Sequence, residues 1–198
     1  MEFIAGSLAL DFINTVGYRS GDAREYLAAP ADLGEWARRA GILHDGSDMR
    51  LTRGQMVRVR AIREELHRLF HALVSGGTPS AHVLAPLNVR LASLAPKRQL
   101  GAGEGGVAWV WSGSVNDPAR VLGPILSSAA ELLASGSYRR IRECRGEMCG
   151  WLFLDRSRAG RRVWCSMADC GNREKGRRHY VRVRAASRGT RAKPRGAP

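Results

Sequence analysis

Four cysteines are the residues of this sequence whose type and spacing could do chemistry. They form two pairs of equal spacing, Cys144 with Cys149 and Cys165 with Cys170, and fifteen residues separate the pairs. A structural zinc site takes four tetrahedral ligands, and thiolates can supply all of them. Tight turns at each pair, joined by a hairpin, would bring the four sulfurs to one point. The spacing therefore predicts one Zn²⁺ ion per chain.

Spacing alone leaves other uses of the thiols open. The cysteines could form a redox-active dithiol switch, hold a labile iron–sulfur cluster, or be four unrelated free thiols. The symmetry of the pairs and the flanking Trp151 and Trp164 speak against unrelated thiols. The N-terminal residues lack the basic start and long apolar stretch of a secretory signal, and no apolar run of about 18 residues occurs. We therefore expect a cytoplasmic protein without a membrane segment, in which disulfides are disfavoured.

Positive charge is concentrated in the part of the chain that contains the cysteines. Of the net charge of +14, residues 1–138 hold 14 Lys and Arg against 13 Asp and Glu, whereas residues 139–198 hold 18 against 5. Such asymmetry indicates two modules with different roles. The basic module predicts a nucleic-acid partner, because Lys and Arg neutralise backbone phosphates.

The near-neutral module reads as mainly helical. Apolar periodicity and end signals predict helices over 8–16, 30–43, 52–76, 81–94 and 117–136. Thr52 and Gln55 form a capping-box pattern, Gly41 is placed to end a helix, and Asp117 precedes Pro118 at a helix start. A strand is predicted at 107–111, after a turn "GAGEGG" at 101–106. The fold class is therefore mainly α with a small β element.

Three further features have structural explanations that we prefer to functional ones. His67 and His71 have metal-ligand spacing on a helix but lack the glutamate of an H-E-x-x-H motif. The "GAGEGG" turn lacks the lysine and hydroxyl residue of a phosphate-binding loop. Asp11 and Asn14 could line a ligand pocket, but we expect them to cap helices or form turns.

The basic module reads as a small metal-dependent fold. Residues 151–155 are predicted to form a strand, 156–160 a turn and 161–165 the returning strand, and a helix follows Cys170. Knuckle, β-hairpin and helix in this order are typical of a treble-clef-like zinc finger. Because about sixty residues form too small a core, we expect the metal to supply much of the folding energy.

The residues of this module carry a family resemblance. The stretch "CGWLFLDRSRAGRRVWCSMADCGNREKGRRHY" resembles the CGNR zinc finger, named for the residues Cys170 to Arg173. The N-terminal stretches "LALDFINTV", "LAAPADLGEWARRAGIL" and "DPARVLGPILSSAAELLASG" are similar to its usual partner, the ABATE domain of stress-induced bacterial transcription regulators. The resemblance implies zinc bound by the four cysteines, a DNA-binding finger, and an N-terminal domain that senses a signal.

The resemblance and the residue pattern together define three expected segments. Residues 1–138 would form the helical ABATE-like domain for sensing or dimerisation, residues 139–186 the finger, and residues 187–198 a disordered basic tail. No effector can be assigned to the first segment.

Basic side chains of the finger are the candidates for nucleic-acid contact. Arg173, Arg177, Tyr180 and Arg184 recur at steps of four, three and four, which places them on one face of a helix. Lys175, Arg178 and Arg182 lie alongside. Arg161 and Arg162 on the hairpin would contact phosphates without reading sequence.

These observations favour a bacterial DNA-binding transcription regulator, acting alone or as a homodimer. A zinc–thiolate redox switch and an RNA- or protein-binding adaptor are the alternatives. We expect no enzymatic activity. The sequence has no nucleophile–base pair or carboxylate dyad at readable spacing, and four cysteine ligands would leave zinc no open coordination position.

Overall fold

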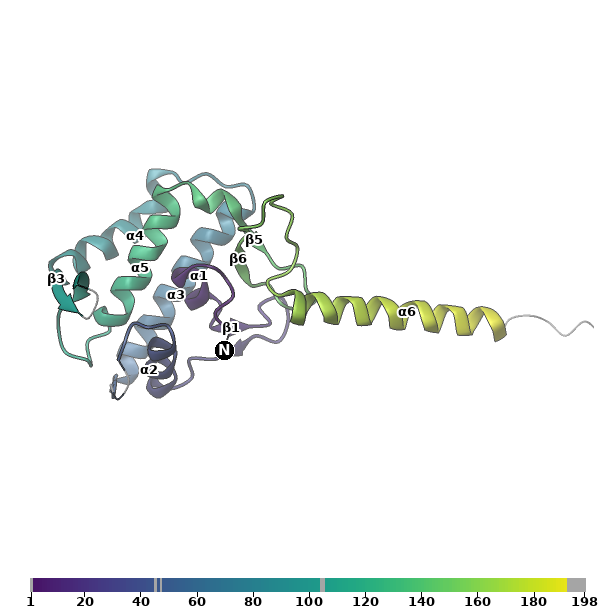
Figure 1. The fold of residues 1–198 in the computed structure, drawn as a ribbon, viewed down its shortest axis with the longest axis horizontal. Coiled ribbons are helices and arrows are strands. Elements are labelled where there is room, and N and C mark those ends of the chain that lie inside the picture. The colour runs from purple at the N-terminus through teal and green to yellow at the C-terminus, as the bar shows by residue number, and fades with distance from the viewer. Residues whose placement is uncertain (1, 45, 47, 104–105, 192–198) are drawn as a thin grey trace, which may run out of the picture.

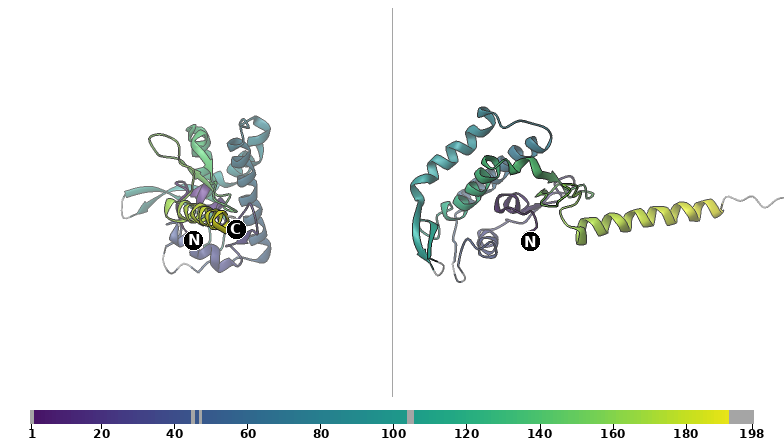
Figure 2. Two further views of the ribbon diagram at one scale, coloured as in Figure 1. Left: turned by 90° about the vertical axis from the view of Figure 1, so that its right-hand side faces the viewer. Right: turned by 45° about the horizontal axis from the view of Figure 1, so that its top comes forward.

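The computed structural model describes residues 2–44, 46, 48–103 and 106–191. Within these residues the chain is mainly helical, with three two-stranded antiparallel sheets. Figure 1 shows a helical body from which one long helix, α6, extends. The same extended arrangement is visible in the turned view on the right of Figure 2. The predicted fold class is confirmed.

Five helices build the body, and a shared apolar core explains their packing. The helices are α1 (Leu8–Ile13), α2 (Pro30–Arg39), α3 (Arg53–Val74), α4 (Ala81–Leu94) and α5 (Ala119–Ala134). The short α1 packs against both α3 and α5, and α4 packs against the same two helices. Phe12, Trp36 and Phe70 are among the largest fully buried side chains of this core. Since α1 is central in the body, its flanking residues are held firmly.

Local end signals predicted the helix boundaries well. The capping box at α3 is present, because Gln55 N donates to Thr52 Oγ1 over 3.2 Å and Thr52 N donates to Gln55 Oε1 over 2.7 Å. Gly41 has a φ of +71° just after α2, as expected for a left-handed helix end. At α5 the prediction was one residue early. Asp117 Oδ1 accepts from Ala119 N over 2.9 Å, and Pro118 is the N-cap residue.

The hairpin between α4 and α5 contains one strand more than the sequence indicated. The predicted strand at 107–111 is β4 (Gly106–Trp111), and it pairs with β3 (Arg98–Gly103), which was not predicted. Residues 101–103 of the expected "GAGEGG" turn belong to β3, and residues 104–105 lie outside the described part of the chain. Gly101 and Gly103 lie at alternate positions of this strand, and their low β-propensity concealed the strand in the sequence.

Buried residues of the body and of the C-terminal module belong to one continuous hydrophobic core. The second module begins with β5 (Ile141–Glu143), which pairs with β6 (Leu152–Leu154). The N-terminal segment lies against β6, since Leu154 N donates to the carbonyl of Ala5 over 2.8 Å. Trp151 Nε1 also donates to the carbonyl of Val16 over 2.8 Å. A further short sheet, β1 (Val16–Gly17) with β2 (Arg24–Glu25), continues this segment.

Asn14 is the side chain that joins the two modules most directly. It is the C-cap residue of α1, which agrees with the expected capping role, and it is 3% exposed. Its Nδ2 donates to the carbonyl of Leu152 over 2.8 Å, and its Oδ1 accepts from Leu152 N over 3.1 Å. The amide thus imitates a neighbouring strand along β6. Asp11 has a comparable structural role, because its Oδ1 accepts from Ala5 N over 2.9 Å.

We expect Asn14→Ala to lower the free energy of unfolding by about 3 kcal/mol, because it leaves the buried N–H and carbonyl of Leu152 unpaired. Denaturant titration of the zinc-loaded chain measures this loss. Asn88→Ala, at an exposed position of α4, is the matched control and should change stability little. Equal stability of the two variants would contradict the bridging role of Asn14.

Asp11 gives a prediction for the pH dependence of stability. Burial raises the pKa of its carboxyl from 3.8 to about 6. The folded chain therefore holds this proton more tightly than the unfolded chain, and the associated stabilisation is lost as pH rises through about 6. Asp11→Asn keeps an acceptor for Ala5 N but does not ionise. The stability of this variant relative to the parent chain should rise between about pH 4 and about pH 7. A difference that stays constant over this range would contradict the raised pKa.

Candidate metal centre

The structure brings all four predicted cysteine ligands together. Cys144 follows β5 and Cys149 precedes β6, so the first pair occupies the turn of this hairpin. Cys165 ends the loop after β6, and Cys170 lies in a π-helical turn, Met167–Gly171. The four Sγ atoms lie within 4.8 Å of one another, and all four side chains are buried.

The spacing of the sulfurs fits one tetrahedral zinc ion. Zn–S bonds of about 2.3 Å place neighbouring sulfurs of a tetrahedron about 3.8 Å apart. The Sγ atoms of Cys149 and Cys165 are 3.8 Å apart, and those of Cys165 and Cys170 are 3.6 Å apart. A disulfide would require about 2.05 Å. Four buried thiol ligands at these separations define a single structural zinc site.

The four sulfurs are close enough for their ionisation to be coupled. Hydrogen bonds from the neighbouring thiols lower the pKa of Cys144. The Cys144 sulfur in turn raises the pKa of Cys149 to about 12 and raises that of Cys165 as well. Four thiolates can coexist only when Zn²⁺ supplies the opposing charge, and ligation deprotonates the remaining thiols.

Gly146 and the backbone conformation of Met148 shape the knuckle between Cys144 and Cys149. Gly146 N donates to Cys144 Sγ over 3.4 Å. A Cβ at Gly146 would lie 3.0 Å from Cys170 Sγ and 3.4 Å from Cys144 Sγ, so a side chain there would crowd the sulfurs. Met148 adopts a φ of +62°, which lets the chain turn back toward Cys149. The backbone N–H of Cys165 donates to Cys144 Sγ over 3.3 Å and links the loop to the knuckle.

The hairpin of the finger lies elsewhere than predicted. The sequence suggested that residues 151–155 pair with 161–165, but β6 pairs with β5, and residues 161–165 form no strand. The carboxylate of Asp155 explains the difference, since it accepts from Ser157 N over 2.9 Å, from Ser157 Oγ over 2.6 Å and from Arg162 N over 2.9 Å. These bonds close the segment after β6 into a loop.

The half-buried Arg162 stabilises the loop that ends at Cys165 by bonding to its backbone. Its Nε donates to the carbonyl of Trp164 over 2.9 Å, and its Nη2 donates to the carbonyl of Cys165. Its guanidinium also lies 4.6 Å from the ring centroid of Phe153. The predicted phosphate contact at Arg162 therefore competes with a structural role. Arg161 has no such partner among the described residues, and it lines a hollow of about 520 Å³ with Arg142 and Arg145.

Helix α6 (Asn172–Arg191) begins directly on the metal site. Ser166 Oγ accepts from Asp169 N over 3.2 Å and starts the π-helical turn that holds Cys170. Arg173 donates to Cys170 Sγ over 3.1 Å and lies 3.4 Å from the carboxylate of Asp169. The thiol sulfur of Cys170 is the main cause of the raised pKa of Arg173. Arg173 is thus a neighbour of the zinc site as well as a member of the basic helix.

The structure divides the other predicted basic residues of α6 into two groups. Arg177 and Arg178 both donate to the carboxylate of Glu174, over 2.9 Å and 2.8 Å. Lys175, Arg182 and Arg184 are exposed and have no carboxylate partner in the part of the chain that the structure describes. Arg184 lies over the ring of Tyr180, with 5.5 Å to the centroid.

The end of α6 differs from the predicted domain boundary. The finger was expected to end at residue 186 and an unfolded tail to cover 187–198, but the helix continues to Arg191. Residues 192–198 lie outside the described chain.

No described helix is both long and apolar enough to span a membrane.

Sequence reasoning missed the acidic residues that organise the basic helix. Glu174 is 9% exposed in spite of its charge, and Glu147 of the knuckle lies 3.7 Å from Arg177. The pattern Glu174, Arg177, Arg178 at steps of three and four was the available signal. The contacts of Arg142 with the loop, where its Nη2 donates to the carbonyl of Gly160 over 3.1 Å, had no comparable signal.

We expect Cys165→Ser to abolish measurable zinc binding and to unfold the finger together with its junction to the body. A structural zinc site contributes on the order of 10 kcal/mol, and β6 shares hydrogen bonds with the N-terminal segment. Metal analysis and the change in tryptophan fluorescence, to which Trp151 and Trp164 of the finger contribute, measure both effects. Chelation of the parent chain, followed by return of zinc, is the control and should reproduce the change reversibly. Stoichiometric zinc in the Cys165→Ser protein would contradict the four-sulfur site.

Comparison with known families agrees with the geometry of the site. The ABATE family model, described as "Putative stress-induced transcription regulator", matches residues 6–136. The CGNR zinc finger model matches residues 140–183. A search of curated proteins gave no match. The two family matches cover the helical body and the four-cysteine site in the predicted order. The chain therefore belongs to the ABATE family and carries a C-terminal CGNR zinc finger.

Proposed function

We propose that this protein is a transcription regulator that binds duplex DNA through α6, with the zinc site fixing the base of the helix. The observation that carries the proposal is the charge and placement of α6. Its sequence contains eight Lys and Arg residues and one Glu, and the helix extends away from the body (Figure 1). The family description supports a regulatory role.

The basic charge exceeds what the protein itself needs. Four thiolates and one Zn²⁺ leave the centre at about −2, and Arg173 lies against one of the sulfurs. Glu174 pairs with Arg177 and Arg178. Lys175, Arg182 and Arg184 are exposed, and counterion release from DNA is the common use of such surplus charge.

The shape of α6 suits a groove of duplex DNA. A helix of 20 residues is roughly 30 Å long, and the major groove is wide enough to admit it. Beyond its base the helix lies outside the body, so its outer turns lack the tertiary packing that gives most helices in proteins their stability. Gly176 within it lowers helix propensity further. Contacts with DNA would therefore stabilise α6.

Apolar side chains on α6 complement its charge. Tyr180 is 61% exposed, Val181 55% and Val183 49%. Such groups contact base methyls, sugars or base faces when a helix enters a groove. They also fit a single-stranded or RNA partner through stacking on Tyr180. Competition between duplex DNA and structured RNA separates the two.

A second copy of the chain would supply the specificity that one small finger lacks. Two half-sites double the number of bases that a regulator contacts. The β3–β4 hairpin offers an apolar surface for such association, because Leu100, Val107 and Trp109 are all more than half exposed. We propose a homodimer on this ground.

Two other expectations remain proposals. We propose that the protein is not an enzyme, because a shell of four cysteines leaves zinc no position for substrate. The redox-switch alternative has less support than DNA binding, since all four cysteines are buried and rapid oxidation requires exposed thiolates.

A salt series of binding to random-sequence duplex DNA tests the role of α6. Each phosphate neutralised adds about 0.9 to the slope of log affinity against log salt. The double variant Arg182→Ala, Arg184→Ala should keep zinc and reduce this slope by about 2. Arg53→Ala, at an exposed position of α3, is the control and should keep the slope. Equal slopes for both variants would show that α6 does not face the nucleic acid.

A further inference from the structure

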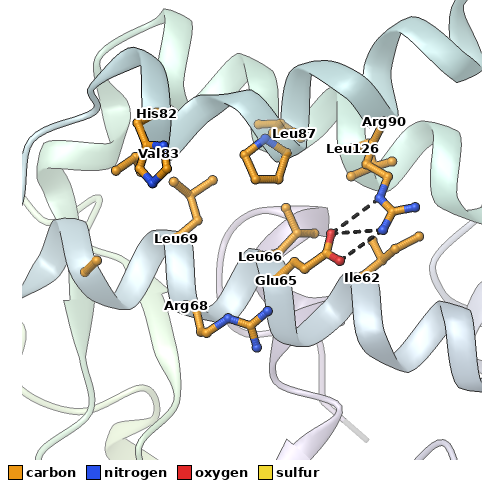
Figure 3. A pocket seen from close by; sticks show the side chains of 12 residues that line it. Ile62, Glu65, Leu66, Arg68, Leu69, His82, Val83, Leu87, Arg90 and Leu126 are labelled. Carbon is orange, nitrogen blue, oxygen red and sulfur yellow. Dashed lines mark hydrogen bonds and ion pairs between the residues drawn. The ribbon is translucent and has the colours of Figure 1, made fainter.

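A groove runs along the body between α3 and α4 and has two compartments of different character. The first, of about 310 Å³, is lined mainly by aliphatic side chains, and Figure 3 shows Leu66, Leu69 and Leu87 around it. The second, of about 370 Å³, lies toward the start of α5 and is more polar. Ile62, Arg90 and Leu126 line both compartments, so the two hollows adjoin.

Arg90 stands at the junction of the compartments. Figure 3 shows its guanidinium, from α4, reaching across to the carboxylate of Glu65 on α3. The pair is bonded through Nε and Nη2, with a shortest distance of 3.0 Å. Nη1 of Arg90 has no hydrogen-bond partner among the described residues, and the side chain is 40% exposed. Two N–H donors at the junction are therefore available to a ligand.

The second compartment carries an excess of positive charge. Arg58, Arg90 and Lys97 line it together with Asp117, and Arg90 is also paired with Glu65 of the first compartment. Asp117 is already paired with Lys97. Arg58 is exposed and has no ion-pair partner within the described ranges of the chain. The compartment is thus complementary to an anionic group.

The first compartment is complementary to an apolar group. Its floor consists of Ile62, Leu66, Leu69 and Leu126, which are themselves buried at the edge of the core. Ligand sites of this kind combine apolar walls with a few polar groups that fix orientation. Removal of an alkyl or aryl group from water onto this floor would be favourable.

The wall formed by α4 is loosely held. Of its 14 residues, only Leu87 and Leu94 are buried. Pro86, in the middle of the helix, lines the groove and cannot donate the usual backbone hydrogen bond. A wall with few core contacts can adjust to an occupant at small cost.

We propose that this groove is a binding site for a small amphipathic anion, an aliphatic or aromatic carboxylate. Its apolar part would occupy the compartment of Leu66, Leu69 and Leu87, and its carboxylate would bind Arg90 and Arg58. The site lies in the body, and the proposal requires nothing of α6 or of DNA binding. The same helix α3 contacts the finger near its C-terminal end, where His71 Nε2 lies 3.5 Å from Glu143 Oε2 of β5.

Calorimetric titration of the zinc-loaded full chain with octanoate, hexanoate and octan-1-ol tests the two compartments. Octanoate should bind saturably at one site per chain. Each added methylene should raise affinity about fourfold, so octanoate should bind about fifteenfold more tightly than hexanoate. Octan-1-ol should bind at least about tenfold more weakly, because it lacks the charge for Arg90 and Arg58. Absence of saturable octanoate binding, or equal affinity for the alcohol, would overturn the proposal.

Two variants with matched controls place the site. Arg58→Gln should weaken octanoate binding about tenfold without affecting octan-1-ol, whereas Arg53→Gln, outside the groove on the same helix, should change neither. Val83→Trp should fill the apolar compartment and weaken both ligands by about tenfold or more. Val89→Trp is its control, since Val89 is 69% exposed and does not line the groove. Unchanged octanoate affinity in both Arg58→Gln and Val83→Trp would exclude this groove.

Discussion

Mutual repulsion among four buried thiolates, relieved by one divalent cation, is the constraint on which the rest of the structure depends. The sulfurs lie within 4.8 Å of one another, and all four cysteine side chains are buried. A Zn²⁺ ion bound by the four sulfurs would therefore hold the knuckle, the loop end and the π-helical turn together. Through Leu152, which follows the knuckle, the same centre is joined to Asn14 and the core of the body. Metal binding and packing of the body are consequently coupled during folding.

What could be predicted from the sequence was local or repetitive. The capping box of Thr52 and Gln55 lies within four residues, and the cysteine pairs repeat one spacing, so both could be identified without any tertiary structure. The pairing of β6 could not be identified in this way, because Asp155 redirects the chain through hydrogen bonds that no periodicity shows. The bonds between Asn14 and Leu152 join residues 138 positions apart. Neither sequence interpretation of Asn14, as a pocket residue or as a cap, identified this partner.

The contacts of the basic side chains of α6 could likewise not be predicted from their spacing. Spacing placed Arg173, Arg177 and Arg184 on one face, but it did not show that Arg173 lies against Cys170 or that Glu174 holds Arg177. The structure divides one predicted stripe into a base engaged with the zinc site and an outer part that faces solvent. This division gives the proposed regulator a rigid base for α6 and an outer helix whose stability depends on its partner. The groove between α3 and α4 is a separate surface of the body.

Amide hydrogen exchange of the zinc-loaded chain, with and without random-sequence duplex DNA, tests the central claim most directly. The account predicts that the outer part of α6, residues 177–184, exchanges rapidly in the free protein because it lies outside the core. DNA should protect these amides strongly while exchange in α3 and α5 stays the same. Protection confined to the β3–β4 hairpin or to the body, with α6 unchanged at saturating DNA, would contradict the assignment of α6 as the nucleic-acid-binding element.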